Sequence, residues 1–327
     1  MVIHVDQLSK SFDYYKKETG IRNSVKNLFH REKLTKDAVN KVSFDINEGE
    51  MVAFLGPNGA GKTTTLKMLS GILYPSGGSA EVLGYTPWDR KNDFKKQFSI
   101  VMGQKNQLWL DLPASDSLYL NKCIYEISDQ KYKDTLDELV TLMDVRHLLH
   151  VQVRRLSLGE RMKMELIAAL LHRPRIIFLD EPTIGLDLVS QKNIREFLKA
   201  YNHEFRTTLL LTSHYMKDIE DLCKRTIVIN QGKLVYDGEI RKINEVMNEK
   251  KRMKLTFSAI VERKDLAVMG SIKEYSGHEV ILEVERTKFK EYSRMAMDHF
   301  PVIDLNLEDI PLEEAIARLY EQPEPQG

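Results

Sequence analysis

The sequence predicts an α/β fold in which a parallel sheet carries a nucleotide-binding loop, followed by a smaller α+β unit. Residues 51–55 are a short apolar run of the kind that forms a buried parallel strand. A glycine-rich loop, residues 56–63, follows it directly. Two further apolar runs, 176–179 and 208–211, enclose a helical segment at 190–205, and this alternation is typical of a βαβ unit.

The loop after the first apolar run reads Gly-Pro-Asn-Gly-Ala-Gly-Lys-Thr, which matches the P-loop pattern. Its glycines let successive backbone N–H groups turn toward a phosphate, and the helix that follows presents its positive end to the anion. We expect Lys62 to reach the outer phosphates and the Thr63 hydroxyl to ligate Mg²⁺. The predicted nucleotide-binding residues here are Gly56, Pro57, Asn58, Gly59, Ala60, Gly61, Lys62, Thr63 and Thr64.

Composition restricts the classes of partner. The 327 residues suggest two domains, and 48 basic against 48 acidic residues give a net charge of zero, which argues against bulk nucleic-acid binding. No run of apolar residues approaches the length of about 18 that a membrane-spanning helix needs. The N-terminus lacks the charged and apolar regions of a signal peptide. Cys123 and Cys223 form no disulfide framework and are expected to be buried thiols, so we predict a cytoplasmic protein.

Outside the loop, the pattern predicts further elements. The first eight residues predict an edge strand, and the turn residues at 231–232 predict a hairpin between 227–230 and 233–236. A helical region is expected from about 115 to 150. The other predicted elements are a second strand at 42–46, a helix at 159–172, C-terminal strands at 254–260, 279–284 and 302–307, and C-terminal helices at 288–300 and 312–320.

Two carboxylates end the strand predicted at 176–179. In an open α/β sheet, ligands bind at the carboxyl ends of the strands. Asp180 is therefore predicted to face the Mg²⁺ held by Thr63, and Glu181 to polarise an attacking water. The alternative is that both carboxylates only cap the following turn, and the P-loop favours the catalytic interpretation.

Residues 1 to about 240 resemble the ATP-binding cassette (ABC) ATPases, because further motifs occur in the family's order. They are Gln104 as the Q-loop glutamine, Leu-Ser-Leu-Gly-Glu at 156–160 as the signature, Gly-Leu-Asp at 185–187 as the D-loop, and His214 as the switch histidine. The resemblance implies a P-loop NTPase core with an antiparallel β subdomain and a helical subdomain at about 105–173. Residues 241–327 would then be an accessory or regulatory α+β domain.

The resemblance also implies roles. Gln104 would contact the metal or water, His214 the outer phosphate, and ATP and Mg²⁺ would be the cofactors. The implied catalytic set is Glu181, His214, Gln104 and Lys62, and the implied metal set is Thr63, Gln104 and Asp180. Ser157, Gly159, Glu160 and Asp187 would contact nucleotide. Phe12 is placed to stack on adenine, with Tyr14 and Tyr15 as alternatives.

Each of these motifs also has an alternative interpretation when it is considered alone. Gln104 could face solvent, His214 could be a capping residue, and Phe12 could belong to the core.

The signature segment departs from the usual Leu-Ser-Gly-Gly-Gln at its third and fifth positions, Leu158 and Glu160. Ser157, Gly159 and the predicted helix start are retained, and these are the groups that would meet a γ-phosphate. Glu160 cannot donate a hydrogen bond as glutamine would. It either turns outward or places its charge at the helix N-terminus.

Residues 182–187, the extended segment 13–37 and the run Trp-Leu-Asp-Leu-Pro at 109–113 are similar to a subgroup that energises separately encoded export permeases. Trp109 and Leu112 either form a docking surface or pack inside the helical subdomain. The implied function is ATP hydrolysis by a dimer, with itself or a related ATPase subunit, which drives integral membrane permease subunits from the inner face of the membrane. The alternative is a soluble ABC ATPase that acts on a ribosome, nucleic acid or an assembly scaffold.

Overall fold

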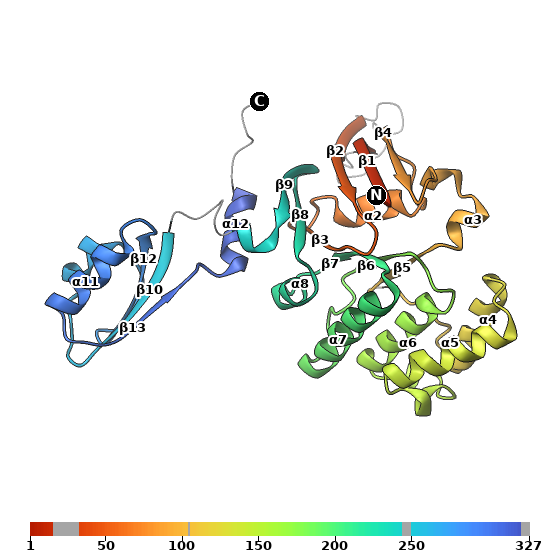
Figure 1. The fold of residues 1–327 in the computed structure, drawn as a ribbon. Helices are drawn as coiled ribbons and strands as arrows, with labels where there is room; N and C mark the ends of the chain where they lie inside the picture. Colours follow the sequence, from red (N-terminus) through yellow and green to blue (C-terminus); the bar gives the residue numbers. More distant parts are fainter. Residues whose placement is uncertain (16–32, 104, 244–249, 322–327) are drawn as a thin grey trace, which may run out of the picture. The chain divides into compact units, whose positions relative to one another are not determined.

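The structure, a computed structural model, describes residues 1–15, 33–103, 105–243 and 250–321. It contains two compact units, Met1–Asp237 and Gly238–Gly327, which are coloured from red to cyan and from cyan to blue (Figure 1). None of the helices in the described part of the chain has the length and apolar composition needed to cross a bilayer.

The first unit is built on a six-stranded sheet with the strand order β5-β6-β7-β3-β8-β9. Parallel pairing joins β3 to β7 and β8, and β6 to β5 and β7, which confirms the predicted parallel sheet. β8 and β9 are neighbours, as the hairpin prediction requires. The bounds are β3 (Met51–Leu55), β5 (Phe98–Met102), β6 (Ile176–Asp180), β7 (Thr208–Thr212), β8 (Arg225–Asn230) and β9 (Lys233–Glu239).

A second, antiparallel sheet in this unit has the order β2-β1-β4, from β1 (Ile3–Tyr15), β2 (Lys33–Ile46) and β4 (Gly77–Val82). The prediction of an edge strand at residues 1–8 is wrong, because β1 is the central strand. Ile3 pairs with Ile46 on one side and with Val82 on the other. The second partner strand lies beyond the P-loop in sequence, so its pairing to β1 leaves no local trace in the N-terminal residues.

The helices α4 to α7 gather on one side of the six-stranded sheet (Figure 1). The helical region expected at 115–150 divides into two helices, because the chain turns after Tyr125, where Glu126 adopts a φ of 54°. The helices of this unit are α2 (Lys62–Leu69), α3 (Asn92–Lys95), α4 (Ala114–Ile124), α5 (Asp129–Leu142), α6 (Leu158–Leu170), α7 (Leu188–Phe205) and α8 (Met216–Leu222).

The second unit has the strand and helix order βαββαβα, and the sheet order β11-β12-β10-β13 gives its first six elements the ferredoxin-like topology. Its core includes Met253, Leu255 and Leu282 from the sheet and Ala296 from α11, all contributed by the unit itself. The sequence patterns missed β11 and α10. The elements are β10 (Lys250–Phe257), α10 (Arg263–Leu266), β11 (Ser271–Tyr275), β12 (Glu279–Glu285), α11 (Phe289–His299), β13 (Val302–Glu308) and α12 (Leu312–Glu321).

Candidate functional site

The P-loop connects the end of β3 to the start of α2. A Cβ atom on Gly61 would lie 2.3 Å from the carbonyl oxygen of Ala38, and Gly61 has a φ of 105°. A Cβ atom on Gly56 would lie 2.2 Å from the carbonyl oxygen of Ile229. Glycine is therefore required at both positions, since any side chain would collide with neighbouring backbone. The first turn of α2 contains no acidic residue, so its N–H groups remain suited to an anion.

Lys62 is buried within this loop. Its Nζ donates to the carbonyl oxygens of Gly56, at 2.6 Å, and Pro57, at 3.2 Å. Burial lowers the pKa of Lys62, while the nearby carboxylates of Glu181 and Asp180 act in the opposite direction. The ammonium is thus held by groups that an incoming phosphate can replace.

Thr63 and Asp180, the two described members of the predicted metal set, meet directly. The Thr63 hydroxyl donates to Oδ2 of Asp180 at 2.8 Å, and the Thr212 hydroxyl donates to Oδ1 at 2.7 Å. Thr212 lies opposite Asp180 in the register of β6 and β7, and the sequence reasoning missed it. The third predicted member, Gln104, lies outside the described residues, as do residues 16–32 of the extended segment.

Glu181 and His214 also meet. His214 Nε2 is 2.7 Å from Glu181 Oε1, with 41% of the histidine side chain and 17% of the glutamate side chain exposed. Glu181 has a φ of 56°, and its backbone N–H donates to the carbonyl oxygen of Thr212 at 3.0 Å. Both residues line a cavity of about 210 Å³. A partly exposed carboxylate beside a histidine can hold and polarise a water molecule.

A buried aspartate behind this pair was not predicted. Asp218 accepts hydrogen bonds from the hydroxyls of Thr183 and Ser213, the latter at 2.9 Å, and from Arg195 Nη1 at 2.7 Å. It therefore fixes the segment that follows Glu181 and the residue that precedes His214. Nothing in the sequence around Asp218 distinguishes it from a solvent-exposed aspartate, so no sequence signal revealed this role.

At the signature segment, Ser157 is the N-cap of α6, and Glu160 folds back onto it. The Glu160 N–H donates to Ser157 Oγ at 3.3 Å, while Glu160 Oε2 accepts from the Ser157 N–H and hydroxyl, both at 2.8 Å. This capping box decides between the two interpretations of Glu160, because the carboxylate lies at the N-terminus of its own helix. Its hydrogen bonds with Ser157 lower the pKa of Glu160.

Asp187 caps the next helix, α7. It accepts from the N–H groups of Val189 and Ser190, at 3.0 and 2.9 Å, and from the Ser190 hydroxyl at 2.6 Å. A Cβ atom on Gly159 would lie 2.4 Å from Ser190 Oγ. The glycine of the signature is therefore the residue that lets the start of α6 lie close to the start of α7.

The three aromatic candidates for adenine stacking are all exposed at the end of β1. Phe12 is 42% exposed and is not a core residue, and Tyr14 and Tyr15 are more exposed still. Lys10 Nζ lies 5.3 Å from the centre of the Phe12 ring. All three remain candidates, since each presents an apolar ring to solvent.

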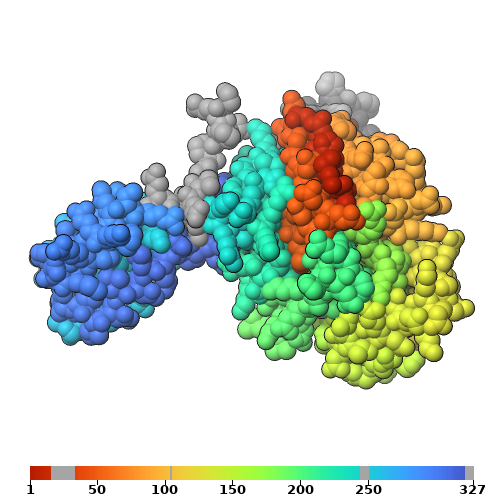
Figure 2. All heavy atoms as spheres, in the orientation of Figure 1, coloured from red at the N-terminus to blue at the C-terminus, as the bar shows by residue number. Residues whose placement is uncertain are grey.

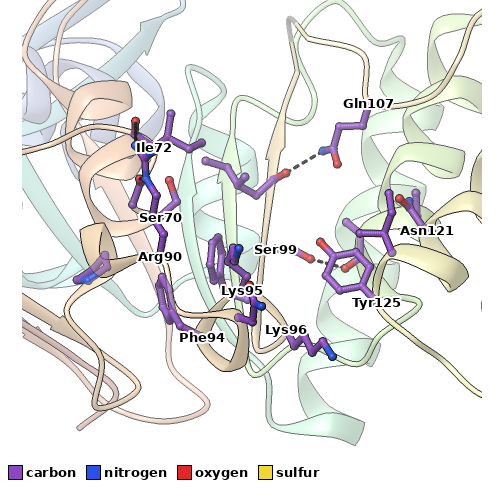
Figure 3. A pocket seen from close by; sticks show the side chains of 18 of the residues that line it. Ser70, Ile72, Arg90, Phe94, Lys95, Lys96, Ser99, Gln107, Asn121 and Tyr125 are labelled. Carbon is purple, nitrogen blue, oxygen red and sulfur yellow. Dashed lines mark hydrogen bonds between the residues drawn. The ribbon is translucent and has the colours of Figure 1, made fainter.

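A cavity of about 690 Å³, which we call the groove, lies between the α2–β5 region and the helices α4 and α6. Ile72, Arg90 and Phe94 stand on one wall, and Gln107 and Tyr125 on the other (Figure 3). On the surface, the orange region before residue 100 borders the yellow helices here (Figure 2).

Exposed apolar side chains lie near the groove in sequence. Trp109 is 59% exposed, and Leu112 is also exposed, so these residues do not pack inside the helical subdomain.

The expectation of two buried thiols is wrong for Cys123, which is exposed on α4, whereas Cys223 is buried. The apolar spacing around Cys123 reflects the face that α4 shows to solvent.

A glycine loop after a buried strand, with carboxylates at the end of another strand of the same sheet, defines a P-loop nucleoside triphosphatase. Residues 39–184 match the family model "ABC transporter". Residues 249–308 match "EvrA-like ABC transporter, C-terminal domain". The chain belongs to the ATP-binding proteins of ABC transporters.

Similar proteins support this assignment. The ABC transporter ATP-binding protein NatA of Bacillus subtilis is 33% identical over 66% of this chain and 88% of its own length. The linearmycin resistance ATP-binding protein LnrL of the same species is 30% identical over 76% of this chain and 80% of its own. The ATP-binding cassette MJ0796, solved as a dimer with ADP and Pi, has the same fold, with a TM-score of 0.60 and 22% sequence identity. The match covers 72% of this chain and 98% of the MJ0796 chain.

Proposed function

We propose that this chain is the ATPase subunit of an exporter, in which two copies close around two ATP molecules and drive a membrane permease docked at the groove. The groove carries the proposal, because it is accessible, combines apolar with basic side chains, and is lined by Gln107, which is close in sequence to the catalytic edge of the sheet. Trp109, two residues after Gln107, and Leu112 add exposed apolar side chains close to it in sequence. The name of the linearmycin resistance relative supports export as the direction.

In this proposal the site residues act on ATP as follows. Lys62 leaves the carbonyls of Gly56 and Pro57 for the outer phosphates. Glu181 holds and polarises the attacking water, and His214, 2.7 Å away, orients the carboxylate. Phe12, Tyr14 or Tyr15 stacks on adenine.

The donor set also fits Mg²⁺. The Thr63 hydroxyl and the Asp180 carboxylate supply the hard oxygen ligands that this ion prefers, and they already lie within 2.8 Å of each other. Gln104 is the third proposed ligand. When bound, Mg²⁺ would neutralise charge on the phosphates, and the protein's part is to hold these oxygens in place.

The dimer places Ser157, Gly159 and Asp187 of one copy at the nucleotide of the other, in a self-complementary interface. Glu160 then has to turn away from Ser157, because a carboxylate and a γ-phosphate repel each other at such a short distance. Residues 1–240 form the nucleotide-binding domain and residues 241–327 an accessory or regulatory domain. The chain sits on the inner face of the cell membrane through the permease, and no nucleic acid takes part.

The proposal is tested by recovering tagged Glu181→Gln protein with ATP from detergent-solubilised membranes. We expect an integral membrane polypeptide to accompany it. The matched control carries Trp109→Ala in addition, which removes apolar surface but no nucleotide contact, and should bind ATP normally while losing the partner. Recovery with ribosomal or scaffold proteins instead would leave the ATPase intact and reject the exporter.

The same substitution gives the largest kinetic effect expected in this protein. Glu181→Gln should lower kcat by about 10²–10³-fold, since the amide cannot accept a proton from water. ATP affinity should stay within about twofold, because Glu181 lies beside the phosphate loop rather than in it. A steady-state phosphate-release assay with a parallel ATP titration measures both. Normal turnover would show that another group activates water.

A further inference from the structure

Glu165 is a buried carboxylate that the site described so far does not use. It lies in the middle of α6 and is 3% exposed, and the residues before and after it in the helix, Met164 and Leu166, are buried apolar residues. Burying a carboxylate costs several kcal/mol unless hydrogen bonds replace its water. We therefore expect hydrogen-bond donors around the Glu165 carboxylate.

Backbone N–H groups of one loop replace that water. Oε1 of Glu165 accepts from the N–H of Gln107 at 3.0 Å and of Leu108 at 3.3 Å, and Oε2 accepts from the N–H of Gln107 at 3.1 Å. Burial raises the pKa of Glu165, while these hydrogen bonds and Arg161, one turn earlier on α6, act in the opposite direction. The carboxylate thus fastens two consecutive residues of the loop to the helix that begins at Ser157.

The other end of this loop lies against the backbone of Asp180 and Glu181. The Gly103 N–H donates to the carbonyl oxygen of Asp180 at 2.8 Å, and a Cβ atom on Gly103 would lie 2.1 Å from the carbonyl oxygen of Glu181. Four residues later the chain is fixed again, by Glu165. The position of Gln107 and Leu108 relative to α6 therefore limits where the segment starting at Gly103 can lie.

The same loop faces the groove. Gln107 lines it, and its side-chain amide donates to the carbonyl oxygen of Ile100 at 2.8 Å (Figure 3). The next residue but one, Trp109, donates its N–H to the Ser117 hydroxyl of α4 at 3.1 Å. One short segment is thus tied to β5, α4 and α6, and the tie to α6 is the charged one.

We propose that Glu165 is a positioning residue for ATP hydrolysis, which acts by fixing Gln107 and Leu108 so that the loop beginning at Gly103 is held beside Asp180 and Glu181. A neutral side chain of the same size would fill the space but bind the two N–H groups less strongly. The role concerns hydrolysis by the chain itself and does not depend on export or on a permease.

The test compares Glu165→Gln and Glu165→Ala with wild-type protein. Glu138→Gln is the matched control, because Glu138 is a partly buried carboxylate of α5 that binds the Arg173 side chain rather than this loop. For both Glu165 variants we expect kcat to fall about tenfold or more, with the Kd and KM for ATP within about twofold, since displacing a loop by an ångström can cost that much in rate. The control should keep the wild-type kcat.

Glu165→Gln preserves volume, so it tests the proposal even if the alanine variant does not fold. A wild-type kcat in Glu165→Gln overturns the proposal. Weakened ATP binding in parallel with a lower thermal midpoint also overturns it, because Glu165 would then serve only the packing of α6. Loss of kcat with unchanged ATP affinity and an unaffected control supports it.

Discussion

The two helices that begin at nucleotide motifs, α2 and α6, differ in what occupies their N-terminal ends. The first turn of α2 has no acidic residue, and Gly61 provides no side-chain cap. The first turn of α6 is capped twice, by the Ser157 hydroxyl and by the Glu160 carboxylate. One positive helix end is free to meet phosphate, and the other is already neutralised by the chain itself.

In the proposed dimer, this difference means that the two halves of each nucleotide site are not equally ready to bind the nucleotide. The glycines of the P-loop already have positive φ, so in the proposed site we expect ATP to bind there with little change of the backbone. The signature end has to give up the contact between Glu160 and the Ser157 hydroxyl before it can meet an anion. Binding and closure are therefore separable steps, and substitutions should affect them separately.

The largest effect should come from a substitution at the uncapped N-terminus of α2. Lys62→Ala removes the cation that α2 presents beside its N-terminus, and we expect ATP affinity to fall about 100-fold, or about 2.7 kcal/mol, for lost charge-assisted hydrogen bonds. Isothermal titration with ATP measures it. Unchanged affinity would mean that nucleotide binds elsewhere.

An intermediate effect should come from removing the negative charge at the N-terminus of α6. Glu160→Gln keeps the capping box, which glutamine can also form, but removes the negative charge. We expect ATP-dependent dimers to form about tenfold more tightly, because about 1.4 kcal/mol of repulsion is removed.

Sedimentation in a Glu181→Gln background, with and without ATP, measures this affinity. Raised salt should narrow the difference between proteins with and without the Glu160→Gln substitution, since screening weakens the same repulsion. Equal dimer affinity at low salt would contradict the inference that Glu160 opposes closure.

The smallest effect concerns acidity. Because the folded-state pKa of Glu160 is lowered by its bonds with Ser157, its contribution to stability is present above the ordinary pKa of about 4.5 and lost as pH falls through the folded value. Wild type should therefore exceed Glu160→Gln in Tm by about 1–2 °C near pH 7, and this difference in Tm should shrink as the pH falls below the ordinary pKa of glutamate. Thermal unfolding in pH steps follows this difference, and a constant difference would exclude the charge as its source.

Sequence patterns predicted the parallel sheet and the meeting of Thr63 with Asp180, because a short motif encodes a strand, a turn and a helix start together. The position of Glu160 at the N-terminus of α6 could also be predicted, since a serine followed three residues later by glutamate is the signature of a capping box. The contacts of Glu165 could not be predicted, because its partners are backbone groups some fifty-eight residues away, and only the packing of α6 brings them together. The central place of β1 was missed for the same reason.

The second unit draws its core from its own strands and helices, and its first and last strands, β10 and β13, are neighbours. In evolutionary terms, such a unit is a module that gene fusion can append to an ATPase, or remove, without reopening an existing core. Selection can therefore act on the packing of this unit through residues of its own, such as Leu255 and Leu282, separately from the phosphate-binding loop.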